Sequence, residues 1–337
     1  MVEARLLDNL DNDDLDNGGQ EEIMKVFVTG ATGFLGRRIV ARLVNAGHEV
    51  LALVRGSGRT VEGATVVIGD LTEVGRWAGC LAGVEVVIHA GGLVAEWASW
   101  SEYDASIVTP TRDLLAAAET HQVRRFVLIS SESVMQDGKP LLDVTEADSE
   151  PSHQSSRYGR AKLQAEQIVR ARQNSIESIV LRPTFIWGPG STTVADLVCR
   201  AMAGRLPLID HGTAVFEHVH VDNVAAAVVA ALTEGTPGAT YFITNGEPMP
   251  HREFLSGLLE AMNAPMPRRS LPSRILFPFA RICEALWSGP LLPGRPPITV
   301  FEVEFLALSR RFDISKARHE LGYRPIVTFA DGLTELR

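Results

Sequence analysis

The sequence has few cysteines, and none of them lies near another. Cys80, Cys199 and Cys283 are three widely spaced thiols in a chain of 337 residues. Disulfide frameworks and zinc sites need cysteines in closely spaced groups, so the sequence argues against both, and we expect no metal. The same scarcity is typical of a reducing compartment. Because the first residues also form no apolar leader, we expect a cytoplasmic protein.

The sequence also lacks long apolar runs and any surplus of basic residues. No uninterrupted apolar stretch reaches the length of about 18 residues that a membrane-spanning helix requires. The net charge is -9, and residues 1–22 contribute -7 of it because they hold eight acids and one arginine. The remaining chain carries only -2, so we expect no nucleic-acid partner. Residues 1–23 are predicted to be a disordered acidic tail.

The chain does contain a glycine turn between a strand and a helix. Residues 26–36 read VFVTGATGFLG, where apolar strand residues lead through three glycines into a helical pattern that begins at Arg37. Gly30 permits the tight turn, Gly33 lets the backbone approach a pyrophosphate, and Gly36 lets the helix pack on the strand. The N–H groups at the helix start attract the phosphates. The stretch predicts a dinucleotide site, with an ordinary glycine-rich turn as the alternative.

Further apolar segments alternate with helical ones along the first half of the chain. Strands are predicted at 49–54, 65–68, 85–89, 125–130 and 178–181, and a long amphipathic helix at 159–172. Strands that are apolar throughout and alternate with helices are typical of a parallel sheet covered on both faces. We therefore predict an α/β fold with a doubly wound parallel (Rossmann) sheet over 24–187, to which 218–245 return. The remaining segments, 188–217 and 246–337, are predicted to form a smaller, discontinuous C-terminal substrate domain.

The second predicted strand ends without an acidic residue. An acid at this place binds the ribose 2′-hydroxyl of NAD, whereas a cation accommodates the 2′-phosphate of NADP. Here the strand ends at Arg55, and Arg59 follows shortly after. The pattern favours NADP with NAD as the alternative, unless both arginines are simply solvated surface charges. Asp70, after the third strand, is placed either to accept from the adenine amino group or to cap a helix.

A tyrosine and a lysine share one face of the long predicted helix. Tyr158 and Lys162 are four residues apart, a spacing that brings side chains together on a helix. A phenol has a pKa near ~10, and a neighbouring ammonium lowers it. Ser131 closes the fifth strand at the same edge of the sheet, where a hydroxyl can hold a substrate oxygen. Tyr158 would then exchange a proton with that oxygen while a hydride moves to or from a nicotinamide.

From residue 24 to residue 337 the chain resembles the extended short-chain dehydrogenases/reductases of the NAD-dependent epimerase/dehydratase superfamily. The resemblance is carried by TGATGFLG at 29–36, DLT at 70–72, HAGG at 89–92, ISS at 129–131, YGRAK at 158–162, LRPTFIWGPG at 181–190 and HVHVDNVA at 218–225. The 3β-hydroxysteroid dehydrogenase-like branch is the nearest. The resemblance implies Ser131, Tyr158 and Lys162 as catalytic residues, with Ser133 as a competitor for the serine's role. It also implies a homodimer formed through two helices of the first domain.

The resemblance and the motifs together predict the lining of the site. The cofactor is expected to contact Gly30, Thr32, Gly33, Phe34, Leu35, Gly36, Arg55, Arg59, Asp70, Leu71, His89, Ala90, Gly91, Tyr158, Lys162, Pro183, Thr184 and Ile186. The substrate is expected to contact Val94, Trp97, Ser131, Ser133 and Trp187. One position departs from the family: Ile107 stands where an asparagine usually supports the proton relay behind the lysine. Water or another residue must therefore take its place.

Two apolar stretches belong to the predicted substrate side. Residues 93–100 read LVAEWASW, and residues 271–287 carry a helical apolar stripe interrupted by Pro278. The stripe is either core of the smaller domain or a hydrophobic surface, which would line a pocket or make a peripheral membrane contact. We predict an NAD(P)-dependent ketoreductase that interconverts a secondary alcohol and a ketone on a hydrophobic, sterol-like or polyketide-like molecule. The alternatives are a nucleotide-sugar epimerase or dehydratase and a non-catalytic dinucleotide-binding sensor.

Overall fold

A seven-stranded parallel sheet forms the centre of the protein in a computed structural model that describes residues 22–288, 292 and 294–337. The acidic tail predicted for 1–23 lies outside these residues, except for its last two. The strands follow the order β12-β7-β5-β4-β1-β2-β3. Their bounds are β1 Lys25–Thr29, β2 Glu49–Val54, β3 Thr65–Ile68, β4 Val86–His89, β5 Arg125–Ile129, β7 Glu177–Pro183 and β12 Thr240–Ile243. This is the doubly wound α/β arrangement that the sequence predicted.

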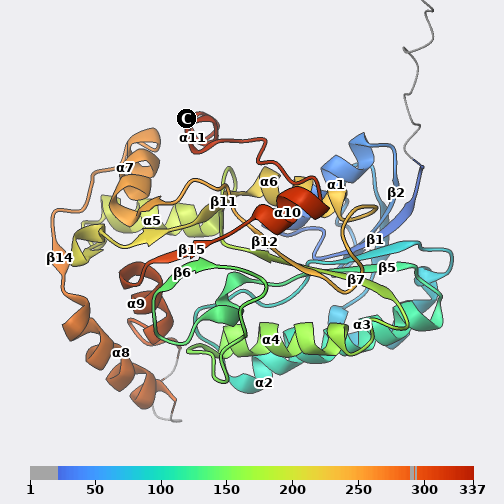
Figure 1. Cartoon of the computed structure of the whole chain (residues 1–337), viewed down its shortest axis with the longest axis horizontal. Helices are drawn as coiled ribbons and strands as arrows, with labels where there is room; N and C mark the ends of the chain where they lie inside the picture. Colours follow the sequence, from blue (N-terminus) through green and yellow to red (C-terminus); the bar gives the residue numbers. More distant parts are fainter. Residues whose placement is uncertain (1–21, 289–291, 293) are drawn as a thin grey trace, which may run out of the picture.

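Helices cover the sheet on both faces, as Figure 1 shows. One face is covered by α1 (Phe34–Asn45) and α6 (Val221–Ala230), which pack against each other. The other is covered by α3 (Thr109–Thr120) and α4 (Arg157–Arg170), which also touch. Because both faces are covered, the middle strands are buried on both sides, which explains why their sequences are continuously apolar.

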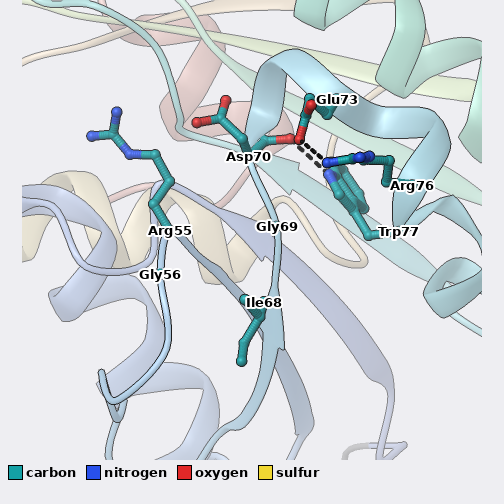
Figure 2. A pocket seen from close by; sticks show the side chains of 8 residues that line it. All are labelled: Arg55, Gly56, Ile68, Gly69, Asp70, Glu73, Arg76 and Trp77. Atoms are coloured by element: carbon teal, nitrogen blue, oxygen red, sulfur yellow. Dashed lines mark hydrogen bonds and ion pairs between the residues drawn. The ribbon is translucent and has the colours of Figure 1, made fainter.

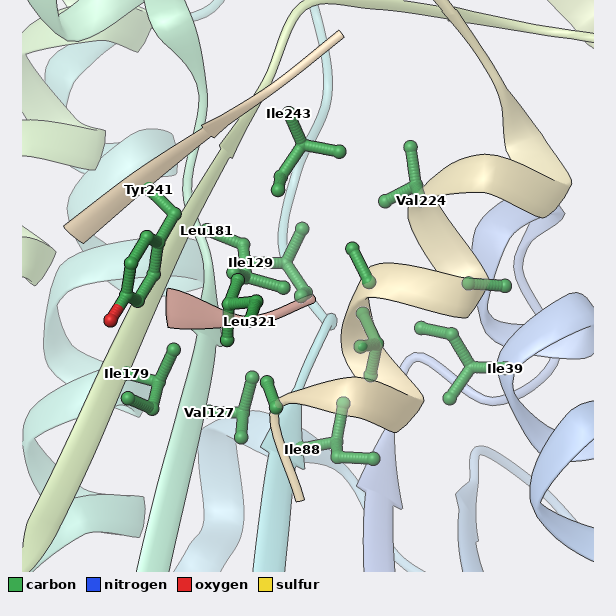
Figure 3. Close-up of a cluster of buried hydrophobic side chains, with 14 of the residues drawn as sticks. Ile39, Ile88, Val127, Ile129, Ile179, Leu181, Val224, Tyr241, Ile243 and Leu321 are labelled. Carbon is green, nitrogen blue, oxygen red and sulfur yellow. The ribbon is translucent and has the colours of Figure 1, made fainter. Parts of the chain in front are cut away.

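Apolar side chains fill both interfaces between sheet and helices. Figure 3 shows the side beneath α1 and α6, where Ile39 and Val224 from the helices meet Ile88 and Val127 from the strands. The opposite side buries a second cluster that includes Phe27. These cores fix the strands in register and so hold the carboxyl ends of β1, β4, β5 and β7 at one edge, where ligands bind in doubly wound sheets.

The remaining helices and short paired strands lie mostly at one end of the sheet and form the smaller part of the protein (Figure 1). The helices are α2 Trp100–Tyr103, α5 Thr192–Met202, α7 His251–Ala261, α8 Ser273–Trp287, α9 Val300–Ala307, α10 Ser315–Glu320 and α11 Phe329–Thr334. The paired strands are β6 Leu141–Val144 with β15 Arg310–Phe312, β8 Phe185–Trp187 with β11 His218–His220, β9 Leu208–Ile209 with β14 Ser270–Leu271, and β10 Val215–Phe216 with β13 Met249–Pro250. Among the described residues, no helix is long and apolar enough to cross a membrane.

Candidate active site

The glycine turn after β1 packs directly against the end of β4. Gly30 has a φ of +70°, and a Cβ placed on it would lie 2.8 Å from the backbone of Ala90 and Gly91. A Cβ on Gly36 would lie only 2.0 Å from the carbonyl oxygen of Gly30. Any side chain at these two positions would push the turn away from the sheet. The backbone that faces a ligand here is therefore set by the absence of side chains.

The start of α1 offers unoccupied backbone donors. Gly33 occupies the N-cap position, so no side chain of the residues that the structure describes accepts from the first helical N–H groups, and the first turn carries no acid. The backbone N–H groups of Phe34 and Leu35 are thus free to bind an anion. Arg37 Nε donates to the Thr32 carbonyl oxygen over 3.0 Å and stiffens the turn. These features fit the pyrophosphate of a dinucleotide.

A pocket of about 300 Å³ lies beyond the ends of β2 and β3 (Figure 2). It is lined by Arg55, Gly56, Ile68, Gly69, Asp70, Glu73, Arg76 and Trp77. Trp77 Nε1 donates to the Asp70 carbonyl oxygen over 2.7 Å, which holds the pocket floor in place. Arg55 and Arg59 are exposed, and neither forms an ion pair with any residue that the structure describes. The arginine charges remain available to an anionic ligand.

Asp70 caps the 3₁₀ turn that follows β3. Its Oδ1 accepts from the backbone N–H of Thr72 over 2.8 Å and from the Thr72 hydroxyl over 2.7 Å. These two hydrogen bonds, aided by Arg55, lower the pKa of the Asp70 carboxyl. The capping alternative for Asp70 is thus correct. Its Oδ2 makes no hydrogen bond within the described part of the chain, which leaves one oxygen for an adenine amino group.

Ser131, Tyr158 and Lys162 come together at the carboxyl end of β5. The first turn of helix α4 packs closely against the turn that follows Ser131. A Cβ on Gly159 would lie only 2.4 Å from the Ser133 carbonyl oxygen, so this contact requires glycine. The Ser131 hydroxyl lies near the phenol of Tyr158 and acts to lower the pKa of that phenol. Lys162 Nζ donates to the Ile129 carbonyl oxygen over 2.9 Å and lies 5.9 Å from the centre of the Tyr158 ring.

The pKa of Tyr158 shifts in the direction opposite to our expectation. Burial raises the pKa of its phenol above the usual value, while the neighbouring Ser131 acts against that shift. Burial also lowers the pKa of Lys162 to about 8, with Glu166 acting against it. In a water-poor site, loss of hydration disfavours the charged form of each group. The protein alone therefore keeps the phenol protonated at neutral pH.

A buried ionic network lies behind Lys162, and the sequence analysis missed it. Glu166, one helical turn further along α4, is fully buried and accepts from the Ser130 hydroxyl over 2.5 Å. Arg182 of β7 binds it through two nitrogens, at 3.0 and 2.6 Å, and Arg170 adds a third contact at 3.0 Å. The sequence did contain a signal for this network, because Glu166 and Arg170 continue the four-residue spacing of Tyr158 and Lys162 and so lie on the same face of the helix. The network fixes α4 against the sheet.

A chain of buried hydrogen bonds ends at Ile107, the position that departs from the family. The backbone N–H of Gly91 donates to the Thr29 hydroxyl over 3.0 Å, and that hydroxyl lies 2.8 Å from His89 Nδ1. His89 Nε2 lies 3.0 Å from the Thr111 hydroxyl, which donates to the Ile107 carbonyl oxygen over 2.6 Å. Burial, with a contribution from Lys162, lowers the pKa of His89 to about 3, so the imidazole is neutral.

In this series of hydrogen bonds, donors and acceptors can be assigned in only one way. Since Thr111 donates to Ile107, it must accept from His89 Nε2–H, and His89 Nδ1 then accepts from Thr29. Both ring nitrogens of His89 hydrogen-bond to protein groups, so only the backbone of His89 is left to contact a cofactor. Ile107 lies in a π-helical turn, Asp104–Val108, of a kind that is frequent at functional sites. The Thr111 hydroxyl thus holds the backbone at the position where the family resemblance leads us to expect an asparagine.

The prediction that Trp187 contacts the substrate is wrong for this structure. Trp187 is completely buried, and its Nε1 donates to His218 Nδ1 over 3.0 Å. Its ring packs edge-on against Phe254 and Phe329, with centroids 5.4 and 5.3 Å away. Trp187 lies at the end of β8, which pairs with β11 outside the large sheet. It therefore belongs to the core of the smaller part of the protein, which lies beside that sheet.

The other predicted substrate residues are spread between surface and interior. Val94 is 81 % exposed, and Trp97 is half-buried with the Arg157 guanidinium 5.1 Å from its ring centre. Ser133 is buried, and its hydroxyl finds no partner among the described residues. The hydroxyl of Thr184, after Pro183 of β7, is likewise buried and without a partner there. The orphaned hydroxyl of Thr184 fits a polar ligand group at the nicotinamide end.

Two aromatic rings beside Tyr158 were not anticipated. The ring of Phe301, on α9, lies 6.5 Å from the Tyr158 ring, and that of Tyr103 lies 6.2 Å away on another side. The Tyr103 hydroxyl donates to the Ala95 carbonyl oxygen over 2.6 Å, which ties the apolar loop 93–100 to the site. The surroundings of the phenol are therefore largely apolar, and the smaller part of the protein contributes to them.

One group of possible metal ligands lies where α1 meets α6. The ligand atoms of His220, Asp222 and Glu335 lie within 4.8 Å of one another. However, Arg38 and Arg42 of α1 both approach the Asp222 carboxylate to 3.7 Å. Two guanidinium groups already balance this carboxylate and oppose a metal cation, so we assign the group a structural role as an ion-pair cluster that joins the two helices.

The strand order, with a glycine turn at the carboxyl end of its first strand, defines a dinucleotide-binding protein of the Rossmann type. The sequence profile of the NAD-dependent epimerase/dehydratase family matches residues 26–244. The chain belongs to this family of enzymes, and within it to the extended short-chain dehydrogenases/reductases, as the sequence predicted.

Three known proteins illustrate the similarity. A 2-alkyl-3-oxoalkanoate reductase of Stenotrophomonas maltophilia is 34% identical over 93% of this chain and 98% of its own. A 3β-hydroxysteroid dehydrogenase/Δ5→4-isomerase of Mycobacterium tuberculosis is 30% identical over 93% and 90%, respectively. The solved dTDP-glucose 4,6-dehydratase of Streptomyces venezuelae, which contains NAD, is 25% identical with a TM-score of 0.73 over 93% of this chain and 95% of that chain.

Proposed function

We propose that the protein is an NADP(H)-dependent ketoreductase that interconverts a ketone and a secondary alcohol on a hydrophobic, sterol-like or polyketide-like substrate. The observation that carries the proposal is the meeting of three groups at one strand edge: the Ser131 hydroxyl, the Tyr158 phenol and the Lys162 ammonium. The names of the reductase and steroid-dehydrogenase relatives support the same chemistry.

In this mechanism the protein's own groups handle the substrate oxygen. The hydroxyls of Ser131 and Tyr158 hold the carbonyl oxygen, and Tyr158 donates its proton as that oxygen gains negative charge. The Tyr158 phenol is protonated at neutral pH, because its pKa is raised, and it can therefore act as a proton donor. The Lys162 ammonium, 5.9 Å from the ring, stabilises the phenolate that forms and is expected to hold the nicotinamide ribose. When bound, the nicotinamide supplies or accepts the hydride.

Turnover with a panel of apolar ketones tests the proposal, measured as loss of the absorbance of NADPH or NADH. We expect net oxidation of NADPH with at least one bulky apolar ketone. If the purified protein instead retains NAD tightly and consumes no reduced dinucleotide, the nucleotide-sugar epimerase or dehydratase becomes the better assignment. Dinucleotide that binds and exchanges freely without turnover of any ketone or sugar nucleotide would favour the sensor.

Arg55 is proposed to bind the 2′-phosphate of NADPH. Replacing Arg55 by glutamate is expected to raise the KM for NADPH by about 10- to 100-fold and to leave the KM for NADH nearly unchanged, because a charge-assisted contact becomes a repulsion. Steady-state kinetics with both dinucleotides provide the measurement. Arg205→Glu is the matched control, since Arg205 is also exposed and lies far along the chain in another segment. An equal change in both KM values would show that Arg55 does not discriminate between the dinucleotides.

A further inference from the structure

Helix α8 exposes a stripe of large apolar side chains. Ile275, Phe279, Ile282 and Leu286 are 61, 50, 58 and 56 % exposed, respectively. Their spacing of four, three and four residues places them along one side of the helix. The neighbouring side, about 100° around the helix, buries Leu276, Ala280 and Cys283 in the core beneath α8. The apolar arc of the helix is therefore wider than the core covers, whereas an ordinary surface helix is apolar only toward the core.

The same segment is rich in arginine. Arg268, Arg269, Arg274 and Arg281 are all exposed, and none forms an ion pair within the described ranges of the chain. Between Arg268 and Trp287 the only acid is Glu284, whose Oε1 accepts from the backbone N–H of Val300 over 2.8 Å. This positive segment belongs to a chain whose net charge is -9. On a helical projection, Arg274 and Arg281 lie along one border of the apolar stripe.

We infer that α8, with the preceding residues 268–271, binds the surface of a membrane that contains anionic lipids. The apolar stripe would lie at the boundary of the acyl chains, and the arginines would contact lipid phosphates while their stems lie along the apolar layer. Leu271, 40 % exposed, extends the stripe toward Arg268 and Arg269. Figure 1 shows α8 at one end of the molecule, away from the sheet, where a flat surface can reach it.

Charge favours lipid over a second copy of the chain as the occupant. Two copies that met through α8 about a two-fold axis would bring the same arginine-rich segments together, and like charges would oppose that contact. The homodimer implied by the family resemblance uses helices of the large domain and would leave α8 uncovered. Phosphate groups of anionic lipids complement both features of the segment.

The position of α8 also connects this surface with the site. Glu284 of α8 accepts from the N-terminus of α9, and Phe301 of α9 lies 6.5 Å from the ring of Tyr158. An apolar substrate that partitions into the membrane would thus enter beside the helix that contacts the phenol. This last step rests on the proposed function, whereas the binding of lipid does not.

Co-sedimentation of the full chain with vesicles tests the inference. Vesicles of phosphatidylcholine alone are compared with vesicles that also contain phosphatidylglycerol. We expect binding to the anionic vesicles, weakened by salt. The triple variant Ile275→Ser, Phe279→Ser, Ile282→Ser should bind about 100-fold less, and Arg274→Glu with Arg281→Glu about tenfold less. Because all five side chains are exposed, circular dichroism and thermal melting should stay unchanged.

Met202→Ser is the matched control, since Met202 is an apolar side chain that is 64 % exposed on another helix. Equal binding of the wild type, the control and the triple variant would overturn the inference, and so would absence of binding to either vesicle. If the wild type does not bind vesicles and the triple variant changes from dimer to monomer in sedimentation, the apolar stripe of α8 is covered by a second copy of the chain. Reduction of a water-soluble ketone, followed separately, reports on the proposed function alone.

Discussion

Replacing Tyr158 by phenylalanine is expected to lower kcat for ketone reduction by about 10³-fold while leaving the dissociation constant for NADPH almost unchanged. The substitution removes one oxygen, which is the proposed proton donor, and general acid catalysis contributes about 10²- to 10⁴-fold. The ring and its contacts with Tyr103 and Phe301 are kept. Single-turnover oxidation of bound NADPH measures the chemical step, and quenching of protein fluorescence measures dinucleotide binding.

Tyr103→Phe is the control for this experiment. Tyr103 belongs to the same aromatic group, and its hydroxyl is bound to the Ala95 carbonyl oxygen rather than directed to the proposed substrate oxygen. We expect a loss of less than about tenfold for this variant, from a small shift of the loop 93–100. If Tyr103→Phe loses as much activity as Tyr158→Phe, or if Tyr158→Phe retains full activity, Tyr158 is not the acid.

The raised pKa of Tyr158 matters for the direction of the reaction. A phenol with a raised pKa is protonated throughout the physiological range and can serve as a donor without prior titration. For oxidation of an alcohol, the same phenol would have to lose its proton first, which the positive charge of a bound oxidised nicotinamide would assist. The phenol therefore has the protonation state that reduction requires, whereas oxidation requires its prior deprotonation.

Local sequence patterns were enough to predict the frame of the site. The glycine turn, the turn after β5 that holds Ser131, and the spacing of Tyr158 and Lys162 depend on residues close in sequence. The parallel sheet brings the strand ends to one edge. Asp70 was also open to a correct local interpretation, because capping of a turn involves only the next two residues. Such features follow from periodicity and turn geometry.

Those local patterns could not predict burial that depends on contacts between residues far apart in sequence. The buried position of Trp187 depends on the pairing of β8 with β11, two strands of three residues each that show no usable period. Phe301 reaches Tyr158 although the two residues lie 143 positions apart in the sequence. The direction of the Tyr158 pKa shift depends on how much water the folded chain excludes. A four-residue spacing on a helix predicts which side chains are neighbours, but it does not predict how much water reaches them.

Lys162→Met is expected to abolish measurable ketone reduction and, at pH 7, to raise the free energy of unfolding by about 1–2 kcal/mol. The Lys162 ammonium is buried, and burial lowers its pKa to about 8 from 10.5. A lowered pKa means that the folded state holds this proton less tightly than the unfolded state does, at a cost of about 1.4 kcal/mol for each pKa unit. The lost hydrogen bond with the Ile129 carbonyl oxygen offsets part of the gain.

The stability difference should depend on pH in a defined way. Below pH 8 the ammonium is charged in both states, so the folded wild type carries the whole cost of its burial. As the pH rises from about 8 toward 10.5, the folded lysine loses its proton first and the cost disappears. The advantage of the methionine variant should therefore shrink across this interval, which denaturant unfolding at several pH values measures.

Lys316→Met provides a closely matched control. Lys316 Nζ also donates to a backbone carbonyl oxygen, that of Thr240 at 3.2 Å, and it also lies over a tyrosine, 5.0 Å from the ring centre of Tyr241. Lys316 lies outside the proposed site, so its replacement should leave ketone reduction intact and should not stabilise the protein. If Lys162→Met instead destabilises the fold at pH 7, the buried network around Glu166 needs the ammonium as a partner. In that case the lysine would be structural as well as functional.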